Sequence, residues 1–216
     1  RAWNTGDEND RAGQPSGQLK AIHQMYWDTD PNHPSYVNLC VAGAFNEFGH
    51  IPDIACQDHY VMYAPNIIPG TGSTRTARME EALSYASKLK ENVEPKITWN
   101  WSQYASTVWS KQPTRWGVNY QFWANVMAGT KGILWFCYVP SLDSNPSFTP
   151  ALAEAMQVTR ELSQVRNLLL YGEPVDNITA TTDKVITRSI VSENAVVVIL
   201  LNNNYSTSGF QWNPNY

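Results

Sequence analysis

The feature that most constrains the fold of this chain is an alternation of short apolar segments with longer amphipathic ones. The short segments have strand character and are Tyr36–Val41, Ile54–Gln57, Lys96–Trp101 and Gly132–Tyr138. Apolar residues at helical spacing predict helices at Gln18–Asp28, Thr76–Asn92, Arg115–Ala128 and Pro150–Leu170. Strands that alternate with helices of this length indicate βαβ units, so we predict an α/β fold with a parallel sheet covered by helices.

The pattern changes after Gly172. Three β-branched segments follow, at Ile178–Thr181, Val185–Val191 and Ala195–Leu201, and a short Ser-Glu-Asn turn separates the last two. This spacing predicts a hairpin, and with it an all-β appendage. The strands and helices before Gly172 make only half of an eight-stranded barrel, which typically needs about 250 residues. We therefore expect the chain to pair with a missing N-terminal barrel half or with other copies of itself.

Composition excludes some partners. The chain of 216 residues has a net charge of −4 and a pI near 5.5, so no basic face for nucleic acid is expected. No apolar run approaches the ~20 residues that a transmembrane helix requires. Nine Trp and 11 Tyr against 16% charged residues is a balance common in extracellular proteins that handle glycans. We therefore expect a secreted, extracellular or periplasmic protein.

The cysteines give no sign of a metal centre. Cys40, Cys56 and Cys137 fall on three different predicted strands, without a CxxC pair and without a histidine at metal-ligand spacing. An unpaired cysteine packs as a small hydrophobe, and we expect that role for all three. Nothing in the sequence predicts a metal or another cofactor.

The predicted strand ends carry aromatic and polar side chains. Ligands of parallel α/β sheets bind at the carboxyl ends of the strands. Aromatic rings stack on the apolar faces of sugars, and amides and carboxylates bond their hydroxyls, so these ends suit a sugar better than a phosphate. The alternative is that the large aromatics fill the barrel or pack beneath helices. The candidate substrate-binding residues are His59, Tyr60, Trp99, Trp101, Gln103 and Trp135.

Several motifs, taken in order, resemble the glycoside hydrolase-like TIM barrels. They are Trp3-Asn-Thr-Gly-Asp-Glu-Asn-Asp10, Asp30-Pro-Asn-His-Pro34, Pro52-Asp-Ile54 with Asp58-His-Tyr60, and Ala128-Gly-Thr-Lys-Gly-Ile-Leu-Trp-Phe136. The all-β tail is similar to the small sandwich that often follows such barrels. The resemblance implies that residues 1–172 are strand four to helix eight of a TIM barrel, and that residues 173–216 begin a β-sandwich domain.

The resemblance also implies an activity, the hydrolysis of glycosidic bonds in a polysaccharide or oligosaccharide. That reaction generally uses two carboxyl groups. Glu8 is the expected general acid, because it ends the strand that supplies this residue in the resembling enzymes. Asp7 beside it is expected to orient it or to raise its pKa, since a nearby like charge disfavours ionisation, and to contribute to substrate binding. The alternative for Glu8 is a solvated carboxylate in an acidic loop.

The second carboxyl group is less clearly marked. Resembling retaining enzymes place a Glu at the tip of the seventh strand, but the tip here holds the amide of Gln103, which cannot act as a nucleophile. Asp58 is the favoured partner, with Glu47 and Asp143 as alternatives. A water-activating base is then expected, with the carboxyl groups of Glu8 and Asp58 about 6.5–9.5 Å apart and an inverting course.

A second function class stays open. A seventh-strand tip without an acid is also what a non-catalytic relative would show. Such a protein would keep the barrel as a glycan-binding or extracellular structural module.

Overall fold

A computed structural model describes residues 1–62, 78–105, 113–138, 148–206 and 211–212. The chain forms two compact units, each built from several segments. The first comprises residues 1–59, 84–101 and 130–134, and the second comprises residues 60–83, 102–129 and 135–216.

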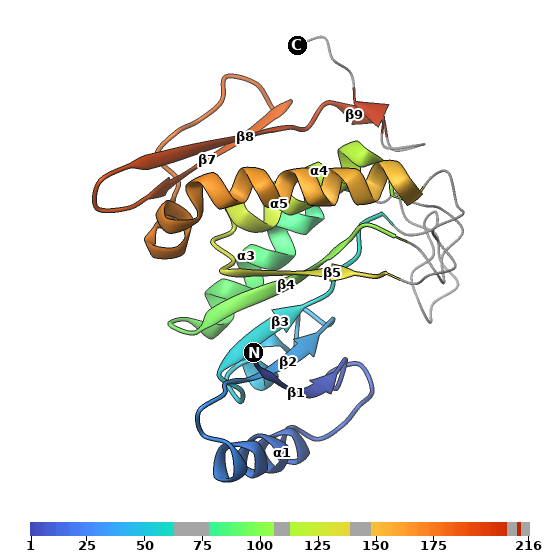
Figure 1. Cartoon of the computed structure of the whole chain (residues 1–216), viewed down its shortest axis with the longest axis vertical. Coiled ribbons are helices and arrows are strands. Elements are labelled where there is room, and N and C mark those ends of the chain that lie inside the picture. Colours follow the sequence, from blue (N-terminus) through green and yellow to red (C-terminus); the bar gives the residue numbers. More distant parts are fainter. Residues whose placement is uncertain (63–77, 106–112, 139–147, 207–210, 213–216) are drawn as a thin grey trace. The chain divides into compact units, whose positions relative to one another are not determined.

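A curled, parallel five-stranded sheet is the main feature of the fold (Figure 1). Its strands follow one another in chain order, β1 (Trp3–Asp7), β2 (Ser35–Leu39), β3 (Ile54–Gln57), β4 (Ile97–Gln103) and β5 (Gly132–Phe136). The pairs β1–β2, β2–β3 and β3–β4 are parallel, as the alternation of strands and helices predicts. The sheet has the form of a half barrel.

Helices connect the strands near the predicted positions. They are α1 (Ser16–Thr29), α2 (Phe45–Phe48), α3 (Glu81–Val93), α4 (Arg115–Met127) and α5 (Phe148–Tyr171). Helix α4 begins at Arg115 as predicted, and the side chain of Thr114 caps it by accepting a hydrogen bond from the backbone N–H of Gly117. Helix α3 begins later than expected, and Thr76, its predicted first residue, lies outside the described residues. No helix in the described ranges is long and apolar enough to cross a membrane.

The core of the first unit forms where one face of the sheet meets its helices. Val37 and Leu39 of β2 are fully buried there with Leu19 of α1 and Leu89 of α3. Burying each such side chain contributes about 1.5–3 kcal/mol. Because successive residues of a strand point to opposite faces, Asn38 lies on the other face of the sheet. The polar side chains of the candidate site lie on that same face.

The second unit contains a small antiparallel sheet. Its strands are β6 (Glu173–Val175), β7 (Val185–Val191) and β8 (Val196–Asn202), and β7 and β8 form the predicted hairpin. The prediction of a strand at Ile178–Thr181 is wrong, because β6, at Glu173–Val175, pairs with β7 instead. A further pair, β9 (Tyr205–Ser206) and β10 (Gln211–Trp212), is also antiparallel. The domain boundary at 172 and the sandwich stay predictions.

Candidate active site

The carboxyl ends of β1, β2 and β3 bring polar side chains to one face of the sheet. Asp7, Asn38, Cys56 and Trp99 are paired in register across β1 to β4. Neighbours in register share a face, and so do residues two positions further along each strand. Cys40 and Asp58 therefore follow Asn38 and Cys56 on this same side, opposite the hydrophobic core.

Glu8 reaches this face through an unusual backbone conformation. In a regular strand it would point away from Asp7 and toward the core. Its φ of 49° is left-handed, which costs a non-glycine residue on the order of 1 kcal/mol. The backbone N–H of Glu8 still bonds the carbonyl of Asn38 at 2.9 Å, while its own carbonyl accepts from Arg11 and Ala12 in a turn. The turn thus redirects the Glu8 side chain without detaching β1 from β2.

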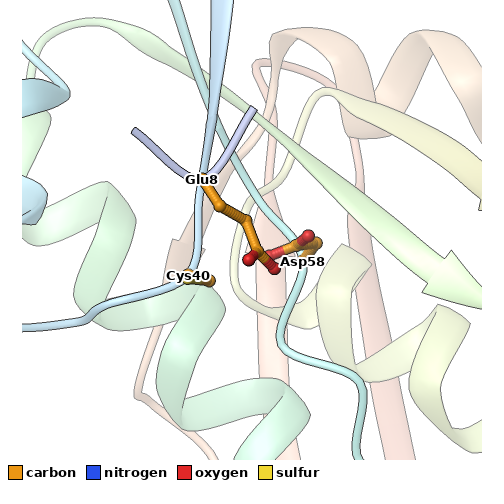
Figure 2. A group of neighbouring side chains, drawn as sticks. All are labelled: Glu8, Cys40 and Asp58. Atoms are coloured by element: carbon orange, nitrogen blue, oxygen red, sulfur yellow. The ribbon is translucent and has the colours of Figure 1, made fainter. Parts of the chain in front are cut away.

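The result is a close group of three side chains from three strand ends. One ligand atom each from Glu8, Cys40 and Asp58 lie within 4.8 Å of one another. Figure 2 shows the two carboxyl groups turned toward each other with the thiol of Cys40 nearby. One oxygen of Glu8 and one of Asp58 thus come closer than the 6.5–9.5 Å that is predicted between the carboxyl groups of an inverting pair. The observed approach is nearer to the roughly 5 Å of retaining pairs.

Asp58 is the buried carboxyl group of the three. It is only 7% exposed, and burial raises its pKa from 3.8 to about 7. A hydrogen bond from Asn38 opposes this rise. Three nearby carboxylates add to it, those of Glu8, Asp7 and Asp10. Asp58 therefore holds a proton up to about neutral pH, unlike an ordinary aspartate.

The other acids of the first loop have different surroundings. The Asp10 carboxylate accepts hydrogen bonds from the backbone N–H groups of Cys40 and Val41, at 3.0 and 2.7 Å, and so holds the end of β2. Glu8 is 35% exposed and forms an ion pair with Arg11 at 3.2 Å. Within the acidic run, Asp10 thus binds the backbone after β2, whereas Glu8 lies beside Asp58.

Asn38 is the polar residue that the sequence reasoning missed. Its side chain is 3% exposed, and its amide nitrogen donates to Asp7 and to Asp58, each at 2.8 Å. The available signal was an amide inside an otherwise apolar strand, where a buried polar group needs a partner. Its partners were invisible because they lie on two other strands.

The donor set of the three-residue group is poorly matched to a metal ion. Carboxylates suit hard cations such as Ca²⁺ and Mg²⁺, which take six or more oxygen ligands. The thiol of Cys40 suits soft metals only as a thiolate, yet burial and the nearby acids raise its pKa far above the usual range. We therefore treat the group as a carboxyl pair with a neutral thiol beside it.

Three predicted substrate-binding residues belong to the first unit with Glu8 and Asp58. Trp99 is half-buried and lies 5.7 Å from the ring of Tyr36, measured between centroids. Trp101 of β4 comes directly after Asn100, which pairs with Gln57, so Trp101 is the neighbour in register of Asp58, the residue that follows β3. His59 stacks on Tyr85, with 3.6 Å between ring centroids.

Three others belong to the second unit. Gln103 is completely buried, and Tyr60 lies 5.0 Å from Phe136 between ring centroids. Trp135 stacks on Phe122 of α4, with 5.7 Å between centroids, so it packs against a helix as the alternative reading of the aromatics holds. The six candidate substrate-binding residues thus divide between the two units, and their role in substrate binding stays a prediction.

The other residues considered in the sequence are the alternative carboxylates and the three cysteines. Glu47 is exposed on the short helix α2, and Asp143 lies outside the described residues. None of Cys40, Cys56 and Cys137 is part of a disulfide bond, and Cys56 is fully buried while the other two are half-buried.

Comparison with known proteins adds no relative. No protein-family model matches the sequence, and no match was found among curated proteins.

Proposed function

We propose that this protein is a secreted carbohydrate-active enzyme that hydrolyses glycosidic bonds in a polysaccharide or oligosaccharide. One observation carries the proposal, the approach of Glu8 and Asp58 from two strand ends to within 4.8 Å. Two carboxyl groups are the minimal apparatus for glycosidic cleavage, provided that one holds a proton and the other does not. The two environments differ in a way that supports this division.

The division assigns the proton to Asp58. Its pKa of about 7 keeps it protonated when it meets substrate, whereas Glu8 is more exposed and is paired with Arg11. Asp58 would deliver its proton to the glycosidic oxygen as the carbon–oxygen bond breaks, and the Glu8 carboxylate would attack the anomeric carbon. This exchanges the roles expected from the resemblance, in which Glu8 is the acid. The close approach of the two groups favours attack by Glu8 over activation of a water between them.

The surroundings of the pair suit a sugar. Oδ1 of Asp58 and Nε1 of Trp101 are buried without a hydrogen-bond partner among the described residues. One is an acceptor or acid and the other a donor, and sugar hydroxyls can satisfy both kinds of group. Trp99, on the same face of β4 as Trp101, offers a ring for stacking.

The test compares acid and nucleophile variants on two substrate types. Glu8→Gln and Asp58→Asn should each lower hydrolysis of unactivated oligosaccharides at least about a hundredfold. Aryl glycosides, whose leaving groups need no proton, should restore much of the activity in Asp58→Asn but not in Glu8→Gln. Glu47→Gln, the same change at an exposed glutamate, is the matched control and should hydrolyse normally. Restoration in Glu8→Gln instead would return the acid role to Glu8.

A non-catalytic glycan-binding module is the second candidate. It is favoured by the tip of β4, which offers the buried amide of Gln103 where retaining relatives would have an acid. This candidate predicts that the chain binds oligosaccharides without cleaving them, and that Glu8→Gln leaves binding intact. Isothermal titration against the substrates used above distinguishes the two.

A further inference from the structure

Asn38 contacts each of the three acidic residues that meet at the ends of β1 and β3. Its amide nitrogen donates one hydrogen bond to Oδ1 of Asp7 and another to Oδ2 of Asp58, each at 2.8 Å. Its backbone carbonyl accepts the N–H of Glu8 at 2.9 Å. An amide nitrogen carries two hydrogens, so both are used on carboxyl oxygens. One buried residue therefore links the carboxyl pair to its neighbour.

The bond to Oδ2 of Asp58 determines where that carboxyl group can carry a proton. A neutral carboxyl group has one hydroxyl oxygen and one carbonyl oxygen, and the carbonyl oxygen is the better acceptor for an N–H donor. Asn38 occupies Oδ2, so the proton belongs on Oδ1. Oδ1 is buried and has no partner in the part of the chain that the structure describes. A proton there is available for transfer.

We propose that Asn38 is a positioning residue that fixes the acidic proton of the Asp58 carboxyl group on Oδ1, through its hydrogen bond to Oδ2. The proposal rests on the proposed function for its catalytic meaning. Its second bond, to Asp7, prevents the amide from rotating, because a rotated amide would turn its oxygen toward two carboxyl groups.

The same bond affects the acidity of Asp58. The donor stabilises the ionised form, so it lowers a pKa that burial has raised. The titratable groups that surround Asp58 are Asp7 at the end of β1, Glu8 and Asp10 from the loop after it, Cys40 directly after β2, and Cys56 of β3. Arg11, which is paired with Glu8, is the nearby cation among the described residues. Asn38 thus supplies a neutral donor in a largely acidic setting.

The experiment follows the titration of Asp58 by NMR of ¹³C-labelled carboxyl groups, with assignment through Asp58→Asn. In Asn38→Leu the midpoint should rise by about one to two pH units, because a hydrogen bond to a charged acceptor is lost. The falling limb of the pH–activity profile should move by the same amount. Asn100→Leu is the matched control, since Asn100 is also a buried amide of the sheet but donates to the hydroxyl of Thr130. In this control variant, the titration midpoint of Asp58 should stay unchanged.

A second measurement needs no variant and guards against loss of folding. In the unmodified protein, the side-chain NH₂ signals of Asn38 should shift with the same midpoint as the Asp58 carboxyl. The inference is overturned if the Asp58 midpoint is unchanged in a folded Asn38→Leu variant. It is also overturned if the Asn38 NH₂ signals do not shift as Asp58 titrates. Neither readout requires hydrolysis. Correct titrations without any cleavage would sink the proposed function alone, and cleavage with an Asn38-independent titration would sink this inference alone.

Discussion

Buried polar groups occur in both units of this protein, but they are matched in opposite ways. In the second unit, Glu154 is 7% exposed and meets a cation and an amide, Arg115 at 3.3 Å and Asn119 at 2.8 Å. In the first unit, Asp58 is equally buried and faces other acids, with the Asn38 amide as its hydrogen-bond donor.

The difference separates a buried acid that is held by complementary partners from one that is surrounded by like charges. A buried charge with complementary partners is satisfied, and removing one partner leaves the other stranded. A buried acid among like charges avoids the cost of a buried charge by holding a proton. Loss of that proton at higher pH destabilises the folded state, but the proton is also what acid catalysis requires. Glu154 thus represents the first kind of cluster and Asp58 the second.

The largest expected effect is the pH dependence of stability due to Asp58. Its folded pKa of about 7 exceeds the ordinary value of 3.8, so the folded protein binds the extra proton between these values. The free energy of unfolding should therefore fall as pH rises from about 4 to about 7, by at most about 4 kcal/mol. Urea denaturation across this range should show the fall in the unmodified protein and a flatter curve in Asp58→Asn. A free energy of unfolding that rises with pH over this range in the unmodified protein would contradict the difference drawn between Asp58 and Glu154.

Breaking the matched cluster should have the next largest effect. Glu154→Ala leaves the amide of Asn119 and the guanidinium of Arg115 without their acceptor, and should lower the free energy of unfolding by about 2–3 kcal/mol at all pH values near neutral. Glu154→Gln keeps an acceptor for Asn119 and should lose less. Thermal denaturation of the two variants measures the effect, and equal losses would mean that the charge rather than the hydrogen bond dominates.

A smaller effect is expected where Trp99 packs over the backbone of β5. A methyl group added at Gly132 would overlap the ring of Trp99, so Gly132→Ala should displace that ring and cost about 1–2 kcal/mol. Altered tryptophan fluorescence together with weaker oligosaccharide binding would connect the ring to the site. The matched control is Gly43→Ala, because a methyl group there meets no atom within 4 Å. Unchanged sugar binding in Gly132→Ala would remove Trp99 from the site.

The smallest effect concerns the start of α4. Thr114→Ala removes the side-chain acceptor for the N–H of Gly117 and should cost about 1 kcal/mol. Thr114→Ser, which keeps a hydroxyl, should be close to neutral. Because Thr114 caps α4 and contributes no group to the candidate site, hydrolysis should be unaffected when measured well below the melting temperature.

The order and type of the main elements were predictable from periodicity alone. Strand β3 and strand β7 have the predicted bounds, and α4 begins at the predicted residue. The failure at Ile178–Thr181 is informative, because that segment is as β-branched as a true strand. Strand formation needs a partner with a free edge, and Glu173–Val175 takes that edge of β7 instead.

The candidate site was predicted in part. Glu8 and Asp58 were singled out as strand-end carboxyl groups, and the structure brings them together. Their spacing, and the separate task of Asp10, were not predictable, because both depend on the turn after β1. A left-handed φ at Glu8 is not encoded by any residue preference that the sequence displays.

By itself, the sequence determined the local pattern: which of the main segments form strands or helices, and which acids stand at strand ends. These follow from short-range periodicity and composition. Only the tertiary structure decided which acid carries the proton and which amide controls it. A pKa depends on burial and on charges contributed by other strands, and Asp58 meets Asn38 and Glu8 only after β1, β2 and β3 have paired.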